Sequence, residues 1–148
     1  MPTTPSPDAA LQLDNQLCFA LYSASLAMTK LYKPLLAELG LTYPQYLAML
    51  VLWEGDGLAV SELGQRLSLD SGTLTPLLKR LEALGLIGRL RAVDDERRVH
   101  IHLTAAGRRL KTRAAKVPGC VLAATGLPLA EVVQLRGRIQ ELRARLAG

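Results

Sequence analysis

Two cysteines, Cys18 and Cys120, carry the most reactive side chains of this sequence. A thiolate is a strong nucleophile and is readily oxidised, so each cysteine is a candidate for redox chemistry. Tyr22 follows Cys18 by one turn and would lie on the same face of a helix. The alternative for either cysteine is a small, buried and unreactive side chain, which is the usual role of an isolated cysteine.

Tyr32 shares a helix face with Cys18 but lies too far along the helix to reach it. At 100° per residue, the two residues fall within about 40° of each other around the axis. At 1.5 Å per residue, they are roughly 21 Å apart along it. Tyr32 could reach the Cys18 of a second chain if two such helices cross antiparallel. The spacing therefore favours a site shared between subunits.

Raising the thiolate fraction cannot by itself make a thiol selective for one oxidant. A thiol at the reference pKa of about 8.5 is a few per cent ionised at neutral pH, so full ionisation gains only about 10–30-fold. Selectivity also needs a shaped apolar pocket. Four residues are candidates to line it, although a core role fits them equally well: Phe19, Tyr22, Tyr46 and Met49.

The central segment, residues 60–103, predicts two helices followed by a β-ribbon. Ser61 would cap a helix over residues 61–67, and Asp70 would cap a second helix that Gly85 ends. The second helix carries leucines at three- and four-residue spacing, which would face a core: Leu74, Leu77, Leu78, Leu81 and Leu84. Alternating apolar residues predict two strands, 86–90 and 98–103, joined by a polar loop at 91–97.

Basic charge is concentrated in this part of the chain. Residues 60–116 hold 12 Lys and Arg against six Asp and Glu, whereas the whole chain has a net charge of only +5. Such a segregated basic region is typical of polyanion binding. All six aromatic residues lie between Phe19 and Trp53, outside it, which argues against stacking on single-stranded bases and favours duplex DNA.

The flanking sequences predict helices around this unit. The fold class is mainly α with a small β-ribbon, in which a disordered tail (1–12) precedes a single domain (13–148). Helical seams at 13–39 and 105–148 would form a dimer interface on either side of a DNA-binding unit at about 43–104. We expect Thr42 and Thr104 to cap helices, and Pro34 to bend or restart the first one.

Two further patterns restrict the function. His100 and His102 could begin a metal site, but no third ligand is near in sequence, so we expect a solvent-facing pair, no metal and no cofactor. The N-terminus lacks the basic and apolar regions of a signal peptide, and no apolar run reaches the roughly 18 residues of a membrane span. We therefore expect a cytoplasmic protein without a structural disulfide framework.

The strings LDSGTLTPLLKRLEALGLI and DDERRVHIHLTAAG resemble the MarR superfamily of winged-helix regulators, and the first resembles its organic hydroperoxide-sensing branch, the OhrR repressors. The resemblance runs from about Leu13 to the C-terminus. It implies a winged helix-turn-helix homodimer, with helices at both termini forming the interface. Such a dimer would present two recognition helices about 34 Å apart to an inverted-repeat operator in double-stranded DNA.

The same resemblance assigns roles to the reactive residues. Cys18 matches the peroxide-sensing cysteine, and Tyr32 and Tyr43, with Tyr22 nearby, match tyrosines that stabilise its thiolate. Cys120 resembles the second cysteine of the two-cysteine class. An organic hydroperoxide would then oxidise Cys18 to a sulfenic acid, a disulfide with Cys120 of the partner subunit would follow, and DNA would be released.

The polar face of the second helix supplies the expected DNA contacts. We expect Ser71, Thr73, Thr75 and Lys79 at the major groove, with Arg80 beside them. By resemblance, Arg97 at the ribbon tip would enter the minor groove and Asp95 would orient it. The remaining arginines of the ribbon would contact phosphates: Arg89, Arg91 and Arg98.

Three functions compete. The first is a peroxide-sensing repressor. The second is a MarR-type regulator that a lipophilic or phenolic ligand releases from DNA without cysteine chemistry. The third is a thiol peroxidase, for which the sequence offers no matching motif, so we expect no enzymatic activity.

Overall fold

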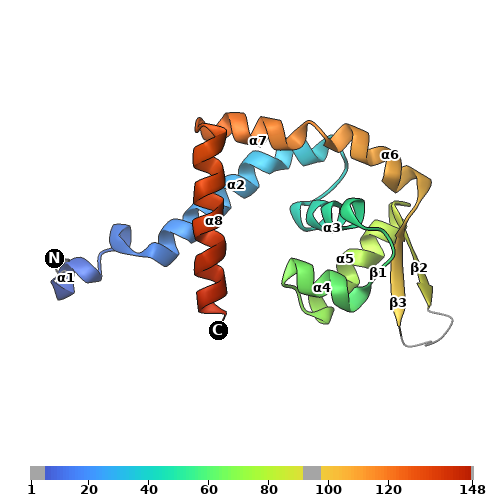
Figure 1. Cartoon of the computed structure of the whole chain (residues 1–148), viewed down its shortest axis with the longest axis horizontal. Helices are drawn as coiled ribbons and strands as arrows, with labels where there is room; N and C mark the ends of the chain where they lie inside the picture. The colour runs from blue at the N-terminus through green and yellow to red at the C-terminus, as the bar shows by residue number, and fades with distance from the viewer. Residues whose placement is uncertain (1–5, 92–97, 148) are drawn as a thin grey trace.

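The computed structural model describes residues 6–91 and 98–147, which form a mainly helical chain with one small antiparallel sheet. A compact unit of helices and strands occupies one side of the molecule, and long helices from both termini extend away from it (Figure 1). The predicted fold class is confirmed for these residues.

The compact unit has the element order of a winged helix-turn-helix. Helix α3 supports the helix pair α4 and α5, and strands β2 and β3 form the wing. The bounds are α3 Tyr43–Glu54, β1 Leu58–Ala59, α4 Val60–Leu67, α5 Ser71–Ala83, β2 Ile87–Arg91 and β3 Val99–Leu103.

The sheet has three strands in the order β1-β3-β2 and not the two that the sequence predicted. Strand β3 lies in the middle, where Ile101 is opposite both Leu58 of β1 and Arg89 of β2. A strand of two residues has no alternation of its own to reveal it. Its pairing with β3 comes from the tertiary fold.

Most predicted helix caps are present. The Asp70 carboxylate accepts a hydrogen bond from the Thr73 backbone N–H at 2.8 Å, and Thr42 forms a capping box with Gln45. Thr104 caps the helix that follows the wing. Ser61 does not cap α4, because that helix begins one residue earlier, at Val60, with the extended Ala59 as its N-cap.

The remaining helices belong to the two ends of the chain. They are α1 Pro7–Ala10, the 3₁₀ turn η1 Leu13–Asn15, α2 Leu17–Ala37, α6 Ala105–Ala114, α7 Val117–Thr125 and α8 Leu129–Leu146. Helix α1 lies inside the tail predicted to be disordered. Pro34 does not restart α2, which continues to Ala37. Helices α6 and α7 are separate, with Pro118 in the first turn of α7.

The core lies within the winged unit and beneath α6. Leu52, Leu63, Leu81 and Ile101 are almost completely buried there. In contrast, no residue of α8 is buried, and this helix descends from the end of α7 apart from the winged unit (Figure 1). Within the described residues, no single helix combines the length and apolar character needed to cross a membrane, and only the pair 105–125 and 129–146, bent by 94°, meets these criteria jointly.

Candidate redox and DNA-binding sites

Cys18 lies at the second position of α2 and is exposed in the single chain. Tyr22, one turn further on, is 62 % exposed. Two leucines of the same helix are also exposed, Leu17 at 61 % and Leu26 at 50 %. Cys18 is therefore not a buried core residue of its own chain.

Cys120 lies in the middle of α7, three residues after that helix begins, and is also an exposed free thiol. Its neighbour Val121 is buried against the core, which anchors α7, while Cys120 faces outward. An exposed cysteine on a short helix after a break is open to reaction with a second thiol.

Three tyrosines form a cluster where the second half of α2 packs against the start of α3. The ring centroids of Tyr32 and Tyr43 are 4.9 Å apart, and Tyr46 lies 5.8 Å from Tyr32 and 6.4 Å from Tyr43. The packing of α2 on α3 brings Tyr32 and Tyr43 together. Tyr22 is not part of the cluster.

Burial raises the pKa of two phenols of this cluster, Tyr32 and Tyr46. It raises the pKa of Tyr32 to about 12, with smaller contributions from Tyr43 and Tyr46, because a phenolate loses solvation and is repelled by neighbouring phenolates. The pKa of Tyr46 is raised for the same reasons. The hydroxyls of Tyr32 and Tyr46 therefore keep their protons at neutral pH and can donate hydrogen bonds. Tyr32 and Tyr43 also line a pocket of about 470 Å³ between α2 and α3.

The proposed pocket residues separate into different environments. Met49 is fully buried in the core, so it has the core role that was the alternative for it. Phe19, in the first turn of α2, is half-buried. Tyr46 is 3 % exposed but borders a second hollow of about 350 Å³ between α3 and α6. The sequence did not reveal that Tyr46 joins the tyrosine cluster, although its three-residue spacing from Tyr43 is compatible with a shared helix face.

The two histidines are not a solvent-facing pair. The Nδ1 atom of His100 lies 2.9 Å from the Gly57 carbonyl oxygen, to which it donates, and both rings are half-buried against the loop before β1. The hydrogen bond of His100 therefore ties β3 to that loop. In the part of the chain that the structure describes, no group of three or more His, Cys, Asp or Glu could hold a metal ion.

Helix α5 presents a polar face to solvent. Ser71, Thr73, Lys79 and Arg80 are exposed, and Thr75 is half-buried. The opposite face holds the buried leucine stripe, of which only Leu84 is exposed, at 51 %. This separation leaves the polar side chains free to contact a groove while the leucines fix the helix to α3.

Fewer of the predicted DNA-contact residues can be placed on the wing. Asp95 and Arg97 lie outside the described residues. Arg89 forms an ion pair with Glu82 at 3.0 Å, whereas Arg98 is exposed. Arg89 and Arg98 line a hollow of about 330 Å³ together with Thr75, between the wing and the start of α4. Arg98 therefore places a positive charge beside the same hollow as Thr75 of α5, whereas the charge of Arg89 is offset by Glu82.

Comparisons with known proteins give the class of this fold. A family model described as "Transcriptional regulator SarA/Rot" matches residues 30–114. The reduced form of AbfR from Staphylococcus epidermidis bound to DNA is 33% identical, with a TM-score of 0.78 over 95% of this chain and 99% of that chain. The disulfide form of AbfR, 35% identical, has a TM-score of 0.62 over 95% of this chain and 93% of that chain.

A sequence relative narrows the class. The organic hydroperoxide resistance transcriptional regulator of Bacillus subtilis strain 168 is 51% identical over 132 residues, which cover 89% of this chain and 90% of that protein. The chain therefore belongs to the MarR family of winged-helix transcriptional regulators. It is a DNA-binding regulator and not an enzyme, and within the family it resembles the organic hydroperoxide resistance regulators.

Proposed function

We propose that this protein is a cytoplasmic repressor that releases DNA when an organic hydroperoxide oxidises Cys18. The observation that carries the proposal is the exposed Cys18 on α2, in a chain 51% identical to a hydroperoxide resistance regulator. The TM-score is higher with reduced, DNA-bound AbfR (0.78) than with its disulfide form (0.62). This difference supports a DNA-binding conformation with free thiols.

The reactive site is completed by a second chain. Cys18 and Tyr32 lie 14 residues apart on one helix, so Tyr32 cannot serve the cysteine of its own chain. Apolar residues of both terminal regions remain exposed, including Leu17, Leu135 and Ile139. A homodimer formed through these helices would cover them. Crossed α2 helices would place the tyrosines of one subunit beside Cys18 of the other.

The chemistry follows from the two thiols and the phenols. Hydroxyls of Tyr32 and Tyr43, with Tyr22 of the cysteine's own turn, would donate hydrogen bonds to the Cys18 thiolate. The thiolate attacks the peroxide oxygen, the O–O bond breaks, and the products are a sulfenic acid and an alcohol. The Cys120 thiol of the partner subunit then displaces water to form a disulfide.

Disulfide formation would require α7 to move. The Cα atoms of a disulfide lie within about 7 Å of each other, so α7 must approach the partner's α2. Because α7 continues from α6, which packs on the winged unit, this movement would change the spacing of the two recognition helices. An inverted-repeat operator would then no longer match both of them.

The decisive test measures DNA affinity by fluorescence anisotropy with an upstream inverted repeat, before and after cumene hydroperoxide. We expect the wild-type protein to dissociate and the Cys18→Ser variant to stay bound. On a non-reducing gel, a covalent dimer should appear in the oxidised wild type and be absent from Cys120→Ser. Oxidant-driven release from Cys18→Ser would overturn the cysteine mechanism and favour release by a bound ligand.

DNA recognition is assigned to α5 and the wing. We propose that Ser71, Thr73, Thr75, Lys79 and Arg80 contact the major groove, while Arg97, oriented by Asp95, enters the minor groove. Lys79→Ala should weaken binding and lower the salt slope by about one unit if it contacts a phosphate. Arg97→Ala should weaken binding strongly. Lys30→Ala, an exposed lysine of α2, is the control, and equal effects of all three variants would contradict the assignment.

A further inference from the structure

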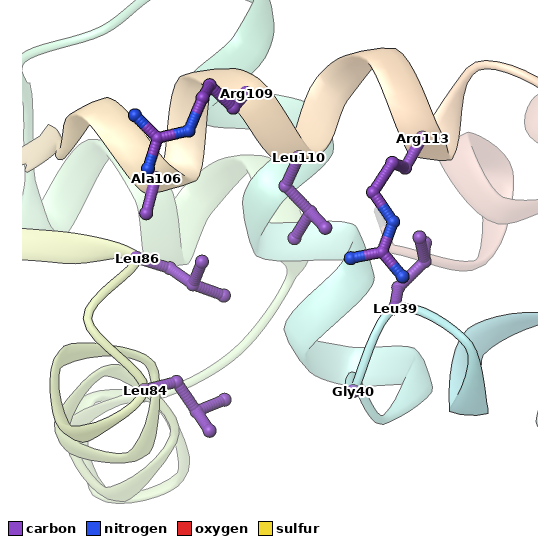
Figure 2. Close-up of a pocket in the computed structure, with 8 residues that line it drawn as sticks. All are labelled: Leu39, Gly40, Leu84, Leu86, Ala106, Arg109, Leu110 and Arg113. Atoms are coloured by element: carbon purple, nitrogen blue, oxygen red, sulfur yellow. The ribbon is translucent and has the colours of Figure 1, made fainter.

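A pocket of about 470 Å³ lies between α6, the α2–α3 corner and the turn after α5, and neither cysteine nor any tyrosine of the cluster lines it. Its walls come from three places: the α2–α3 corner at Leu39 and Gly40, the turn after α5 at Leu84 and Leu86, and α6 (Figure 2). A volume of this size is in the range of small-molecule sites in proteins.

The floor of this pocket is aliphatic. Leu39 and Leu110 belong to the buried core, Leu86 is half-buried, and Leu84 is exposed at its edge. No aromatic ring lines it among the residues that the structure describes. The exposed Leu84 is the one leucine of the α5 stripe that the protein leaves in water. The floor therefore suits an alkyl chain.

The rim of this pocket is positively charged and without a matching acid. Arg109 and Arg113 are four residues apart on α6 and border the pocket on either side of Leu110 (Figure 2). Arg109 has no hydrogen-bond or ion-pair partner among the described residues. Arg113 donates one N–H to the Glu38 carbonyl oxygen, and the Glu38 carboxylate is already paired with Lys116 at 3.0 Å.

We propose that this pocket binds an aliphatic carboxylate, with the carboxylate on Arg109 and the alkyl chain over Leu39, Leu84 and Leu86. A guanidinium recognises a carboxylate by paired, charge-assisted hydrogen bonds. The bound chain would join the end of the recognition helix α5 to α6. This site is independent of the proposed redox function, because neither cysteine and none of the clustered tyrosines lines it.

The site is distinct from the hollow between α3 and α6. That hollow is lined by Tyr46, Trp53 and Lys111, and Lys111 lies on a different face of α6 from Arg109 and Arg113. The two positions can therefore be separated by substitutions within one helix. Lys111→Gln removes a charge from α6 without touching the proposed site.

The test is isothermal titration calorimetry of the full-length Cys18→Ser/Cys120→Ser protein with decanoate, decanol and benzoate. We expect saturable binding of decanoate, and binding at least tenfold weaker for decanol, which lacks the charge, and for benzoate, which lacks the chain. Arg109→Gln should weaken decanoate binding roughly tenfold or more, and Lys111→Gln should leave it unchanged.

A second variant excludes a general effect of lost charge. Ala106→Phe would fill the α6 wall of the pocket and should abolish decanoate binding while all arginines remain. Equal binding of decanoate by wild type and Arg109→Gln, or a loss of binding in Lys111→Gln, would overturn the assignment. Since the Cys18→Ser/Cys120→Ser variant lacks both thiols, neither outcome bears on the hydroperoxide mechanism.

Discussion

Apolar side chains are buried in the winged unit and exposed in the flanking arm. We define the flanking arm as α1, η1, the first half of α2 and α8. In the winged unit Met49, Leu63 and Ile101 are fully buried by the same chain. In the flanking arm Leu17, Leu135 and many other apolar residues remain in water. One chain therefore suffices to build the core of the winged unit but leaves the apolar face of the arm uncovered.

This difference matters because the exposed Cys18 lies on the flanking arm. Contiguous exposed apolar residues usually mark a surface that another chain covers. Chemistry at Cys18 would then depend on assembly, whereas the shape of α5 would depend on the core of its own unit. The predictions below separate these two dependencies, beginning with the largest expected effect.

Introducing charge into α8 should break the assembly and leave the winged unit folded. In Leu135→Asp/Ile139→Asp, two residues that are 51% and 42% exposed in the single chain become carboxylates in the proposed interface. An unpaired buried charge costs about 3–5 kcal/mol, so the dissociation constant of the dimer should rise at least about 100-fold. Analytical ultracentrifugation checks this. Gln140→Asp, on the polar side of α8, is the control, and a dimeric double variant would refute the interface.

Adding one methyl group to Gly107 should destabilise the winged unit itself. A Cβ there would lie 2.2 Å from the Leu86 carbonyl oxygen, which is backbone and already accepts a hydrogen bond from the Thr104 N–H. The resulting strain, about 1–3 kcal/mol, exceeds the gain of up to about 1 kcal/mol from alanine in a helix. Urea denaturation measures the difference. Gly119→Ala, which meets nothing within 4 Å, should be neutral or stabilising.

Removing the cap of α6 should have a smaller effect on the same unit. The Thr104 hydroxyl accepts from the Gly107 N–H at 3.0 Å and donates to the Gly85 carbonyl at 2.6 Å. Thr104→Ala should lower the free energy of unfolding by about 1–2 kcal/mol. Thr112→Ala, on the exposed side of α6, should change it by less than about 0.5 kcal/mol. Similar losses in both variants would mean that the cap contributes nothing specific.

The smallest effect concerns the start of the recognition helix at acid pH. The backbone N–H of Thr73 lowers the pKa of Asp70, together with the Thr73 side chain and the Gly72 N–H. The charged carboxylate therefore stabilises the folded state above about pH 4, the unfolded value, and this contribution is lost as the pH falls through the lower folded pKa. Urea midpoints measured from pH 6 to 3 should fall less steeply in Asp70→Asn than in wild type.

The winged unit was largely predictable because its signals are local. Asp70, the leucine stripe and Gly85 delimit α5 within a few residues, and Gly85 has the positive φ of 77° that ends such a helix. Strand β1 was missed because two residues carry no periodicity. Ser61 was misplaced as a cap because the extended Ala59, held in the sheet, starts the helix instead.

The candidate sites were predictable only in part. Helical spacing placed Cys18 and Tyr22 on one turn and separated them from Tyr32. The contact between Tyr32, Tyr43 and Tyr46 depends on how α2 packs on α3, which no local pattern specifies. Arg109 and Arg113 of α6 share a four-residue spacing, but the leucines that they border come from distant parts of the chain.

Trp53 is the sole tryptophan of the sequence, and it lies where the winged unit meets α6. Its indole Nε1–H donates to the Gly107 carbonyl oxygen at 3.0 Å, and the ring borders the hollow between α3 and α6. Any shift of α6 relative to α3 changes the polarity around that ring. The protein thus carries an intrinsic fluorophore where α3 meets α6, and its emission reports movement between these two helices without an added label.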